Sequence, residues 1–292
     1  IFANKKHSMR IPSNRIKDIK RFAINELKDI YSENEIKIMI SQLISHFTSF
    51  DNIQQLISED KTVLESDLLK LNFAIKDLKH NKPLQYIIGY SEFYNLRIGL
   101  RNKVLIPRGE TEELVDLIIK ENKDREGLKI VDLCTGSGAI ALALKKNIPS
   151  ANVWAVDNDI NAINQARENS QTLGIDINIL EQDILKQGFT TEKFDIIVSN
   201  PPYVMEKEKQ LMKENVLDYE PHQALFVEDN NPLIFYKAIE KFSQTNLNPK
   251  GKVYLEINEN LSKQTSDLFK LGSVEERKDI NSKDRFVIVR FS

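Results

Sequence analysis

The apolar run at residues 194–199 ends in the segment Asn200-Pro201-Pro202-Tyr203, and this junction limits the possible folds more than any other feature. The run is short, continuous and rich in β-branched residues, which is typical of a buried strand in a parallel sheet. Two consecutive prolines cannot continue a sheet, because neither has an N–H group and each fixes its own φ angle. The strand therefore ends abruptly and leaves Asn200 at its carboxyl end, the edge where open α/β sheets bind ligands.

The side chain of Asn200 and the backbone carbonyl of Pro201 together offer two hydrogen-bond acceptors that suit a planar –NH2 group. The pair indicates chemistry on an amide or on an exocyclic amine. Asn-Pro is also a common way to open a turn, so the segment taken alone favours a simple turn. Other parts of the chain shift the balance towards a ligand site.

A glycine-rich turn follows another predicted strand. Residues 130–133 form that strand, residues 139–146 a helix, and the turn between them is Cys134-Thr135-Gly136-Ser137-Gly138. Gly136 and Gly138 permit positive φ angles and a close approach of the backbone to a ligand. A phosphate-binding P-loop is excluded, because no Gly-Lys-Ser/Thr follows. Ala141 stands where a dinucleotide fingerprint has its third glycine, and since such fingerprints allow alanine there, NAD binding stays possible at this point.

Acidic residues follow or interrupt three predicted strands. Asp157 ends the strand at residues 152–156, 21 residues after Gly136, which is about the spacing of an acid that binds a ribose diol. A helix N-cap is the alternative, and ribose binding is favoured. Asp132 lies inside a strand, where an unpaired carboxylate is costly, so we expect it to bind loop amides or approach the cofactor. Asp183 follows the run at 177–180 at the same edge, and acids there fit a nucleoside with a cationic centre better than a pyrophosphate.

The composition predicts a folded protein of one large or two ordinary domains, with 292 residues, 41% hydrophobic and 29% charged. No apolar run reaches the roughly 18 residues of a membrane span, and the first residues lack the apolar core of a signal peptide. We expect Met9 to be the natural start and residues 1–8 to be additional. The single cysteine, Cys134, excludes an internal disulfide and suits a reducing cytoplasm; its place in the turn indicates a packing role. No His and Cys cluster has metal-ligand spacing.

The net charge of −2 gives no general basic field for nucleic acid. Residues 1–21 differ, because seven cations stand against Asp18: Lys5, Lys6, Arg10, Arg15, Lys17, Lys20 and Arg21. A solvated helix face with a tail is the favoured interpretation. Contact with an acidic surface or with RNA is the alternative.

Hydrophobic periodicity predicts a small helical bundle over residues 15–80. Residues 86–106 have the pattern of strands and favour a hairpin, with strands at 86–89, 93–98 and 104–106. A helix opens after Pro107, and from residue 128 strands and helices alternate, which argues for a parallel sheet. The last predicted strands are residues 252–257 and 285–290.

Several motifs together resemble the HemK/PrmC family of S-adenosylmethionine-dependent methyltransferases. Besides the glycine turn, Asp157 and Asn200-Pro201-Pro202-Tyr203, they are Pro83-Leu84-Gln85-Tyr86-Ile87-Ile88-Gly89, Glu92-Phe93, Leu105-Ile106-Pro107-Arg108 with Glu110-Thr111-Glu112, Glu220-Pro221 with Ala224-Leu225, and Asp284-Arg285. The specific motifs cover roughly residues 80–292, and the first 80 residues match in kind. Two positions depart from the family: Gly109 replaces a usual second proline, and Ile184 stands where an aromatic residue often packs on adenine.

The resemblance implies an α/β fold: a class I methyltransferase Rossmann-like seven-stranded sheet with a reversed last strand, preceded by a helical bundle. It implies an N-terminal helical substrate-recognition domain at 1–82, a β-hairpin connector at 83–107 and the methyltransferase domain at 108–292. The implied reaction moves a methyl group from S-adenosyl-L-methionine to the side-chain nitrogen of the glutamine in the Gly-Gly-Gln motif of class-1 peptide-chain release factors. A cytoplasmic monomer is expected, with no metal, membrane contact or sequence-specific contact to nucleic acid.

The resemblance also assigns site residues by position. The expected cofactor-binding residues are Cys134, Thr135, Gly136, Ser137, Gly138, Asp157, Asp183, Ile184 and Asn200. The expected substrate-binding residues are Asn200, Pro201, Pro202 and Tyr203, of which Asn200, Pro201 and Tyr203 are expected to be catalytic.

Four other functions remain possible. An adenine-N6 nucleic-acid methyltransferase also needs acceptors for an exocyclic amine, but it needs a basic groove that the net charge of −2 does not provide. A ribosomal-protein or RNA methyltransferase has only the basic stretch at 1–21 in its favour. A NAD-dependent oxidoreductase lacks a His or Tyr-Lys proton donor near a strand end, and the intact Asn-Pro-Pro-Tyr segment argues against a non-catalytic binding module.

Overall fold

The computed structural model describes residues 10–57, 59–186 and 190–292, so the expectation about Met9 and residues 1–8 lies outside the described residues. The chain divides into two compact units, Ile1–Ile88 and Gly89–Ser292. This division falls six residues after the expected boundary at 82/83, and it divides the expected connector at 83–107 between the two units.

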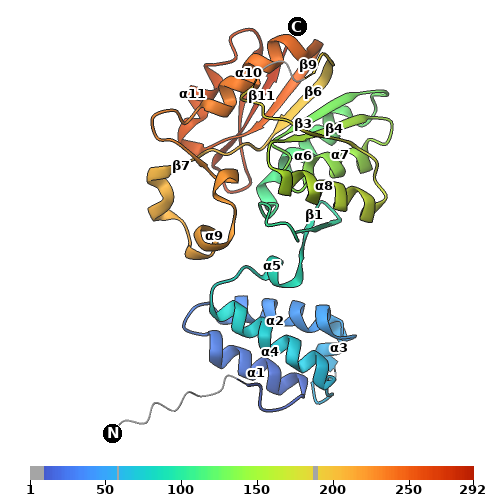
Figure 1. Cartoon of the computed structure of the whole chain (residues 1–292), viewed down its shortest axis with the longest axis vertical. Coiled ribbons are helices and arrows are strands. Elements are labelled where there is room, and N and C mark those ends of the chain that lie inside the picture. The colour runs from blue at the N-terminus through green and yellow to red at the C-terminus, as the bar shows by residue number, and fades with distance from the viewer. Residues whose placement is uncertain (1–9, 58, 187–189) are drawn as a thin grey trace. The chain divides into compact units, whose positions relative to one another are not determined.

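The first unit is a helical bundle, as the periodicity predicted (Figure 1). Its helices are α1 (Ile16–Leu27), α2 (Glu33–Phe47), α3 (Asn52–Ile57), α4 (Glu65–Lys79) and α5 (Leu84–Ile88). One face of α1 is apolar and buried, since Ile16, Ile19 and Leu27 are fully enclosed in the bundle core. The helix α2 begins at a capping box, in which Ser32 and Glu35 each bond the other's backbone N–H.

The predicted strand at residues 86–89 is wrong, because Tyr86, Ile87 and Ile88 continue the short helix α5 and Gly89 lies in a turn. The backbone N–H groups of Tyr86 and Ile87 both donate to the carbonyl of Pro83, which starts the helical turn. Ile87 and Ile88 then pack against the bundle core. A short apolar run has no periodicity that separates a strand from a helix, so packing decides here.

The second unit begins with a hairpin of β1 (Tyr90–Phe93) and β2 (Leu96–Gly99). Tyr94 and Asn95 form its turn with φ angles of 45° and 60°, the left-handed geometry that suits a two-residue hairpin. The predicted strand at 93–98 is wrong as a continuous strand, because this turn divides its residues between β1 and β2. The predicted strand at 104–106 does not form. Ile106 is buried, but its N–H donates to the side chain of Glu220 instead of joining a ladder.

The main sheet has seven strands in the order β10-β11-β9-β6-β3-β4-β5. They are β3 (Lys129–Leu133), β4 (Asn152–Asp157), β5 (Asn178–Glu181), β6 (Phe194–Ser199), β9 (Leu247–Glu256), β10 (Ser273–Lys278) and β11 (Asp284–Arg290). The ladders from β5 to β9 are parallel, and β11 runs antiparallel to both of its neighbours. The predicted Rossmann-like sheet with a reversed last strand is therefore confirmed.

Helices cover both faces of this sheet (Figure 1). They are α6 (Gly109–Asn122), α7 (Ala139–Asn147), α8 (Ile160–Leu173), α10 (Ile234–Asn246) and α11 (Ser262–Ser266). The connection after β6 holds the short pair β7 (Val204–Met205) and β8 (Phe226–Val227), the helix α9 (Glu214–Tyr219) and two 3-10 turns at Glu206–Leu211 and His222–Ala224; a third lies at Glu259–Leu261.

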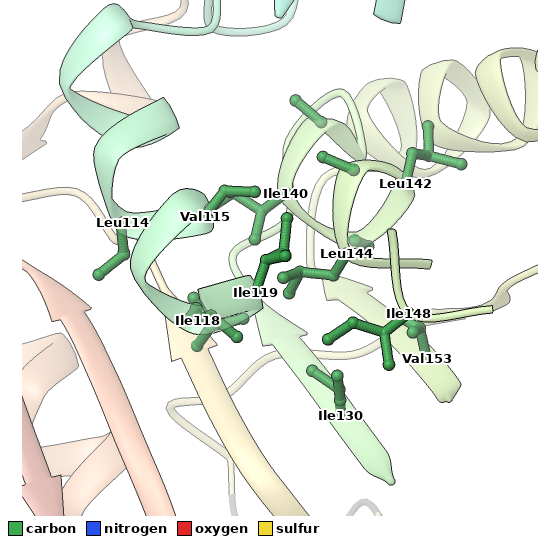
Figure 2. Close-up of a cluster of buried hydrophobic side chains, with 14 of the residues drawn as sticks. Leu114, Val115, Ile118, Ile119, Ile130, Ile140, Leu142, Leu144, Ile148 and Val153 are labelled. Carbon is green, nitrogen blue, oxygen red and sulfur yellow. The ribbon is translucent and has the colours of Figure 1, made fainter. Parts of the chain in front are cut away.

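Successive residues of β3 belong to different cores because side chains alternate along a strand. Ile130 packs with Ile118 and Ile140 from α6 and α7, as Figure 2 shows. Its neighbour Val131 packs with Tyr236 from α10 on the other face. With both faces filled, the polar carboxyl edge of the sheet remains for ligands.

No helix of the described residues has the length and apolarity that a membrane span requires.

Candidate active site

A cavity of about 250 Å³ opens at the carboxyl ends of β3, β4, β5 and β6. It lies where the strand order reverses, because the chain continues from β3 to β4 and β5 on one side and then returns to place β6 on the other. This is the position at which open α/β sheets bind ligands. The volume is near the lower end of the range for small-molecule sites, which starts at roughly 300 Å³.

Seven of the residues expected in the site line this cavity: Cys134, Gly136, Asp157, Asp183, Ile184, Asn200 and Pro202. The expected cofactor residues Thr135, Ser137 and Gly138 do not line the cavity. Their contacts are with the protein and hold the turn in place. The Thr135 hydroxyl donates to the Asp132 carboxylate at 2.5 Å, and the Ser137 carbonyl accepts a bond of 2.8 Å from Asn169.

The two glycines of the turn have different reasons to be glycine. Gly138 has a φ of 81°, and a Cβ there would lie 3.1 Å from the Cβ of Ala166 on α8. It is therefore required for packing as well as for its backbone angle. Gly136 has a φ of 57°, lines the cavity, and would have no atom within 4 Å of an added Cβ. The space above Gly136 is thus open for a ligand to approach the backbone.

Asp157 connects the end of β4 to the glycine turn. Its Oδ2 accepts a bond of 2.8 Å from the Gly136 N–H, and its Oδ1 accepts one of 3.0 Å from the Asp159 N–H. Burial raises the pKa of Asp157, and the backbone donors act against this rise. The residue that caps α8 is Asp159, so the N-cap alternative for Asp157 is wrong. Ribose binding by Asp157 stays a prediction.

Two further expected residues follow β5. Asp183 lines the cavity, and its Oδ1 accepts a bond of 3.0 Å from the Leu185 N–H. Ile184 is buried, packs with the core on the α10 face and contributes to the cavity wall. The branched side chain of Ile184 therefore stands where the family often has an aromatic ring.

Asp132 does not approach the cavity. It is fully buried in β3, its Oδ2 accepts from Thr135, and its Oδ1 has no hydrogen-bond partner among the described residues. Burial raises its pKa to about 7. Asp132 was expected either to bind the turn or to approach the cofactor, and the structure supports the first role. The bond comes from the hydroxyl of Thr135, whereas a backbone amide of the turn was expected.

A second cavity, of about 40 Å³, adjoins the first, and both are lined by Leu105, Asn200 and Ala224. Pro201, Tyr203 and Arg108 are among the other residues that line the smaller cavity. Asn200 therefore lies between a larger cavity at the sheet edge and a smaller cavity beside the proline pair.

The Asn200 side chain is held by its nitrogen. Its Nδ2 lies 3.2 Å from the hydroxyl oxygen of Thr111, on the first turn of α6. Within the described part of the chain, neither the Asn200 Oδ1 nor the Pro201 carbonyl accepts a hydrogen bond. The two predicted acceptors are thus available to a substrate.

Tyr203 is held in a different way. Its hydroxyl donates to Oε1 of Glu256 at 2.9 Å. Burial raises the pKa of Tyr203 well above its usual value, and the charge of Glu256 adds to this rise. The phenol is therefore neutral, and the residue offers an apolar ring to its surroundings, not a base.

Sequence reasoning assigned no role to several residues of this site. Leu105 and Ala224 line both cavities, and Phe235 on α10 lines the larger one. Leu105 and Ala224 stand within motifs that carry the family resemblance, and those motifs could have indicated that the two residues belong to the site. Phe235 is an ordinary apolar helix residue, and no pattern distinguishes it.

Glu220 and Arg108 hold the walls of the smaller cavity together. The Arg108 Nη2 donates to the Glu220 Oε1 at 2.6 Å, and the Glu220 Oε2 accepts from the Ile106 N–H at 3.1 Å.

Gly109, which departs from the family pattern, is the first residue of α6, and an added Cβ there would meet no atom within 4 Å. The site geometry therefore does not require glycine at this position.

Comparison with known proteins assigns the chain to a family. Residues 111–223 match the family described as "Methyltransferase small domain", and residues 18–89 match the "PrmC N-terminal domain". The chain is 40% identical over 282 residues to the "Release factor glutamine methyltransferase" of Flavobacterium psychrophilum, covering 94% of this chain and 99% of that protein. The chain belongs to the release factor glutamine methyltransferase family.

Other members of this family agree. The protein of that name from Bacteroides thetaiotaomicron is 40% identical over 265 residues, covering 89% of this chain and 95% of its own length. The one from Clostridium acetobutylicum is 33% identical over 284 residues, covering 94% and 98%. The chain is thus a methyltransferase of this family, and the likeness extends over the helical unit and the sheet.

Solved structures support the fold. A methyltransferase from Pyrococcus furiosus matches with a TM-score of 0.50 at 23% identity, covering 67% of this chain and 88% of that one. The 16S rRNA N2 G1207 methyltransferase of T. Thermophilus matches with a TM-score of 0.50 at 17% identity, covering 70% and 50%. Among the described residues, no group of three or more His, Cys, Asp or Glu side chains is arranged to hold a metal ion.

Proposed function

We propose that this enzyme transfers a methyl group from S-adenosylmethionine to the side-chain amide nitrogen of the glutamine in the Gly-Gly-Gln motif of class-1 peptide-chain release factors. The observation that carries the proposal is the acceptor pair of Asn200 Oδ1 and the Pro201 carbonyl, available at the junction of two cavities. The family supports the substrate, because relatives that share nearly the whole chain have names that give release factor glutamine as their target.

The larger cavity fits S-adenosylmethionine by its chemistry. The carboxylates of Asp157 and Asp183 line it and suit the ribose and the positive charge of that cofactor. The open space above Gly136 allows the ligand to lie against the backbone, and Ile184 provides an apolar surface for the adenine ring. When bound, this cofactor supplies a methyl group on a positively charged sulfur. Cys134, Thr135, Ser137 and Gly138 contribute by shaping the turn.

Asn200 and Pro201, at the junction of the two cavities, would help an amide nitrogen to accept a methyl group. An amide nitrogen is a poor nucleophile because its lone pair is delocalised into the carbonyl group. Asn200 Oδ1 and the Pro201 carbonyl would accept the two N–H hydrogens of the substrate, which fixes the nitrogen and stabilises positive charge that develops on it. Pro202 and the neutral ring of Tyr203 would pack against the amide plane and exclude water during the transfer. The nitrogen would lose one proton to water after the methyl group has been transferred, so no tuned general base is needed.

The helical unit is proposed to recognise the release factor. We retain a monomer and a cytoplasmic location as predictions, along with the absence of sequence-specific contact to nucleic acid. The basic residues of the stretch 1–21 that the structure describes are largely paired with acids: Lys17 with Asp60, and Arg15 and Arg21 with Asp18. This pairing favours the solvated helix face over an RNA contact.

A transfer assay with labelled methyl donor tests the proposal. Purified class-1 release factor, duplex DNA and a mixture of ribosomal proteins are offered in parallel at equal concentration. We expect label in the release factor only, and its loss when the motif glutamine is replaced by Glu. Label in DNA or in the ribosomal proteins, with an unlabelled release factor, would favour the alternatives and overturn the proposal.

A further inference from the structure

The Asn200 side chain ends a chain of three hydrogen bonds, of which the central one is buried and the outer two are partly buried. Asn200 Nδ2 lies 3.2 Å from the Thr111 hydroxyl oxygen, that hydroxyl lies 2.7 Å from Glu256 Oε2, and Glu256 Oε1 accepts from Tyr203. Thr111 is 4% exposed and Glu256 1% exposed, so water does not compete for the bond between them. The four residues come from the start of α6, the end of β9 and the segment after β6.

The direction of each bond follows from counting protons. A carboxylate only accepts, and a threonine hydroxyl has one proton. The Thr111 hydroxyl therefore donates its hydrogen bond to Glu256 Oε2, and the Thr111 oxygen can only accept from its other neighbour. That neighbour must be the –NH2 end of the Asn200 amide, so the Asn200 oxygen faces away from Thr111.

Two hydroxyl groups directed at Glu256 set this direction, because each of its carboxyl oxygens accepts from one of them. Burial raises the pKa of Glu256, while the two hydroxyl donors and the charge of Arg285 on β11 favour the carboxylate. The nitrogen and oxygen ends of an amide are nearly equal in size, so packing alone does not choose between them. The network supplies the choice through Thr111 and Glu256, which line neither cavity.

We propose that Thr111 and Glu256 are positioning residues that fix the Asn200 amide with its oxygen, and not its –NH2 group, towards the substrate. Catalysis by this arrangement rests on the proposed function, because an –NH2 substrate needs an acceptor and a reversed amide would present a donor. Thr111 and Glu256 line neither cavity, and they act through Asn200.

The substitution Thr111→Val removes the hydroxyl and keeps the shape, and Thr111→Ser keeps the hydroxyl. We expect Thr111→Val to lower kcat about 10- to 100-fold, the range for one lost buried hydrogen bond, with KM for the methyl donor nearly unchanged. Thr111→Ser should restore the rate to within about threefold of wild type. Thr265→Val is the matched control, because the Thr265 hydroxyl is also buried, has no hydrogen-bond partner among the described residues and lies in α11.

A double-mutant cycle separates positioning from a general structural role. If Thr111 acts through Asn200, Thr111→Val should slow the Asn200→Ala enzyme by less than about twofold. Additive losses in the double mutant would overturn the proposal.

A second readout needs no substrate. The side-chain amide signal of Asn200 in a ¹H–¹⁵N spectrum is identified by its absence in Asn200→Ala, and its hydrogen exchange is measured. We expect exchange at least about tenfold faster in Thr111→Val than in wild type or Thr111→Ser, because a buried bond protects the –NH2 group. Equal exchange in all three would overturn the positioning proposal. If the release factor is not methylated but exchange follows the prediction, the proposed function fails and the positioning of Asn200 stands.

Discussion

Arg108 and Glu220 form an ion pair across the wall of the smaller cavity, with 2.6 Å between Nη2 and Oε1. The Glu220 side chain is 1% exposed and that of Arg108 is 33% exposed. The same carboxylate accepts from the Ile106 N–H, so one buried acid holds two points of the segment before α6. That segment includes Leu105, which lines both cavities.

Replacing Arg108 by Ala should therefore destabilise the enzyme and loosen the wall of the smaller cavity. The change leaves a buried carboxylate with one backbone donor, which we expect to cost about 2 kcal/mol of unfolding free energy, less than a fully enclosed pair because Arg108 is partly solvated. The matched control is Arg101→Ala, whose pair with Glu168 at 2.9 Å is more exposed and should cost below about 1 kcal/mol. Equal losses in urea unfolding of the two variants would contradict this role.

Gly109→Pro should stabilise the protein. Gly109 is the first residue of α6, where proline fits because its missing N–H has no helical partner. The preceding Arg108 has φ −102° and ψ 150°, an extended conformation that proline tolerates in its neighbour. We expect a gain of about 0.5–1 kcal/mol by chemical unfolding, mainly from lower entropy of the unfolded chain. Gly127→Pro is the contrast: its φ of 66° excludes proline and should give a loss. A loss for both variants would refute the prediction.

Asp132 should make the stability depend on pH in the direction opposite to an ordinary ion-paired acid. Its pKa is raised to about 7 by burial, so the folded protein binds the proton more tightly than the unfolded chain. This contribution is complete below about pH 4 and is lost as the pH rises through about 7, by an amount on the order of 4 kcal/mol.

The measurement is the unfolding free energy of wild type and Asp132→Asn between pH 4 and pH 8. The difference between the two proteins should change over this range, with the variant gaining relative stability as the pH rises. Asp124→Asn, at an exposed position, is the control that should follow wild type. A constant difference between wild type and Asp132→Asn would show that Asp132 titrates alike in the folded and unfolded states.

The sequence allowed the sheet to be predicted because its strands carry local signals. The run at 194–199, for example, is continuous and ends at two prolines, and β6 occupies those residues. The strand β10 was not identified from sequence, because Ser273–Lys278 is mostly polar and exposed at the sheet edge. Residues 86–89 were wrongly predicted to form a strand, because the short apolar run at 86–88 packs as part of the helix α5.

The candidate site was predictable only where its residues belong to a contiguous motif. Asn200 and Pro201 stand together in the chain, so their acceptor pair can be read from the sequence. The bond between Thr111 and Glu256 joins residues 145 positions apart and depends on how α6 meets β9. The different roles of Gly136 and Gly138 likewise depend on Ala166, which approaches only one of them.

Asn200→Ala should separate cofactor binding from transfer. Loss of one acceptor for the substrate amide is expected to lower kcat about 100- to 1000-fold, near 3 kcal/mol in the barrier. Cofactor affinity, followed by fluorescence of the single tryptophan, Trp154, should stay within about threefold. Asn178→Ala, at the amino end of β5, is the control that should keep full turnover. Unchanged turnover in Asn200→Ala would remove Asn200 from the mechanism.

The most direct test is a crystal structure of the enzyme with S-adenosylhomocysteine and a release-factor peptide that contains Gly-Gly-Gln. The quantities to measure are the two distances from the glutamine side-chain nitrogen to Asn200 Oδ1 and to the Pro201 carbonyl oxygen. We predict that both lie within about 3.2 Å, with the nitrogen facing the cofactor sulfur. A glutamine nitrogen bound elsewhere, or an Asn200 oxygen turned away from it, would contradict the account.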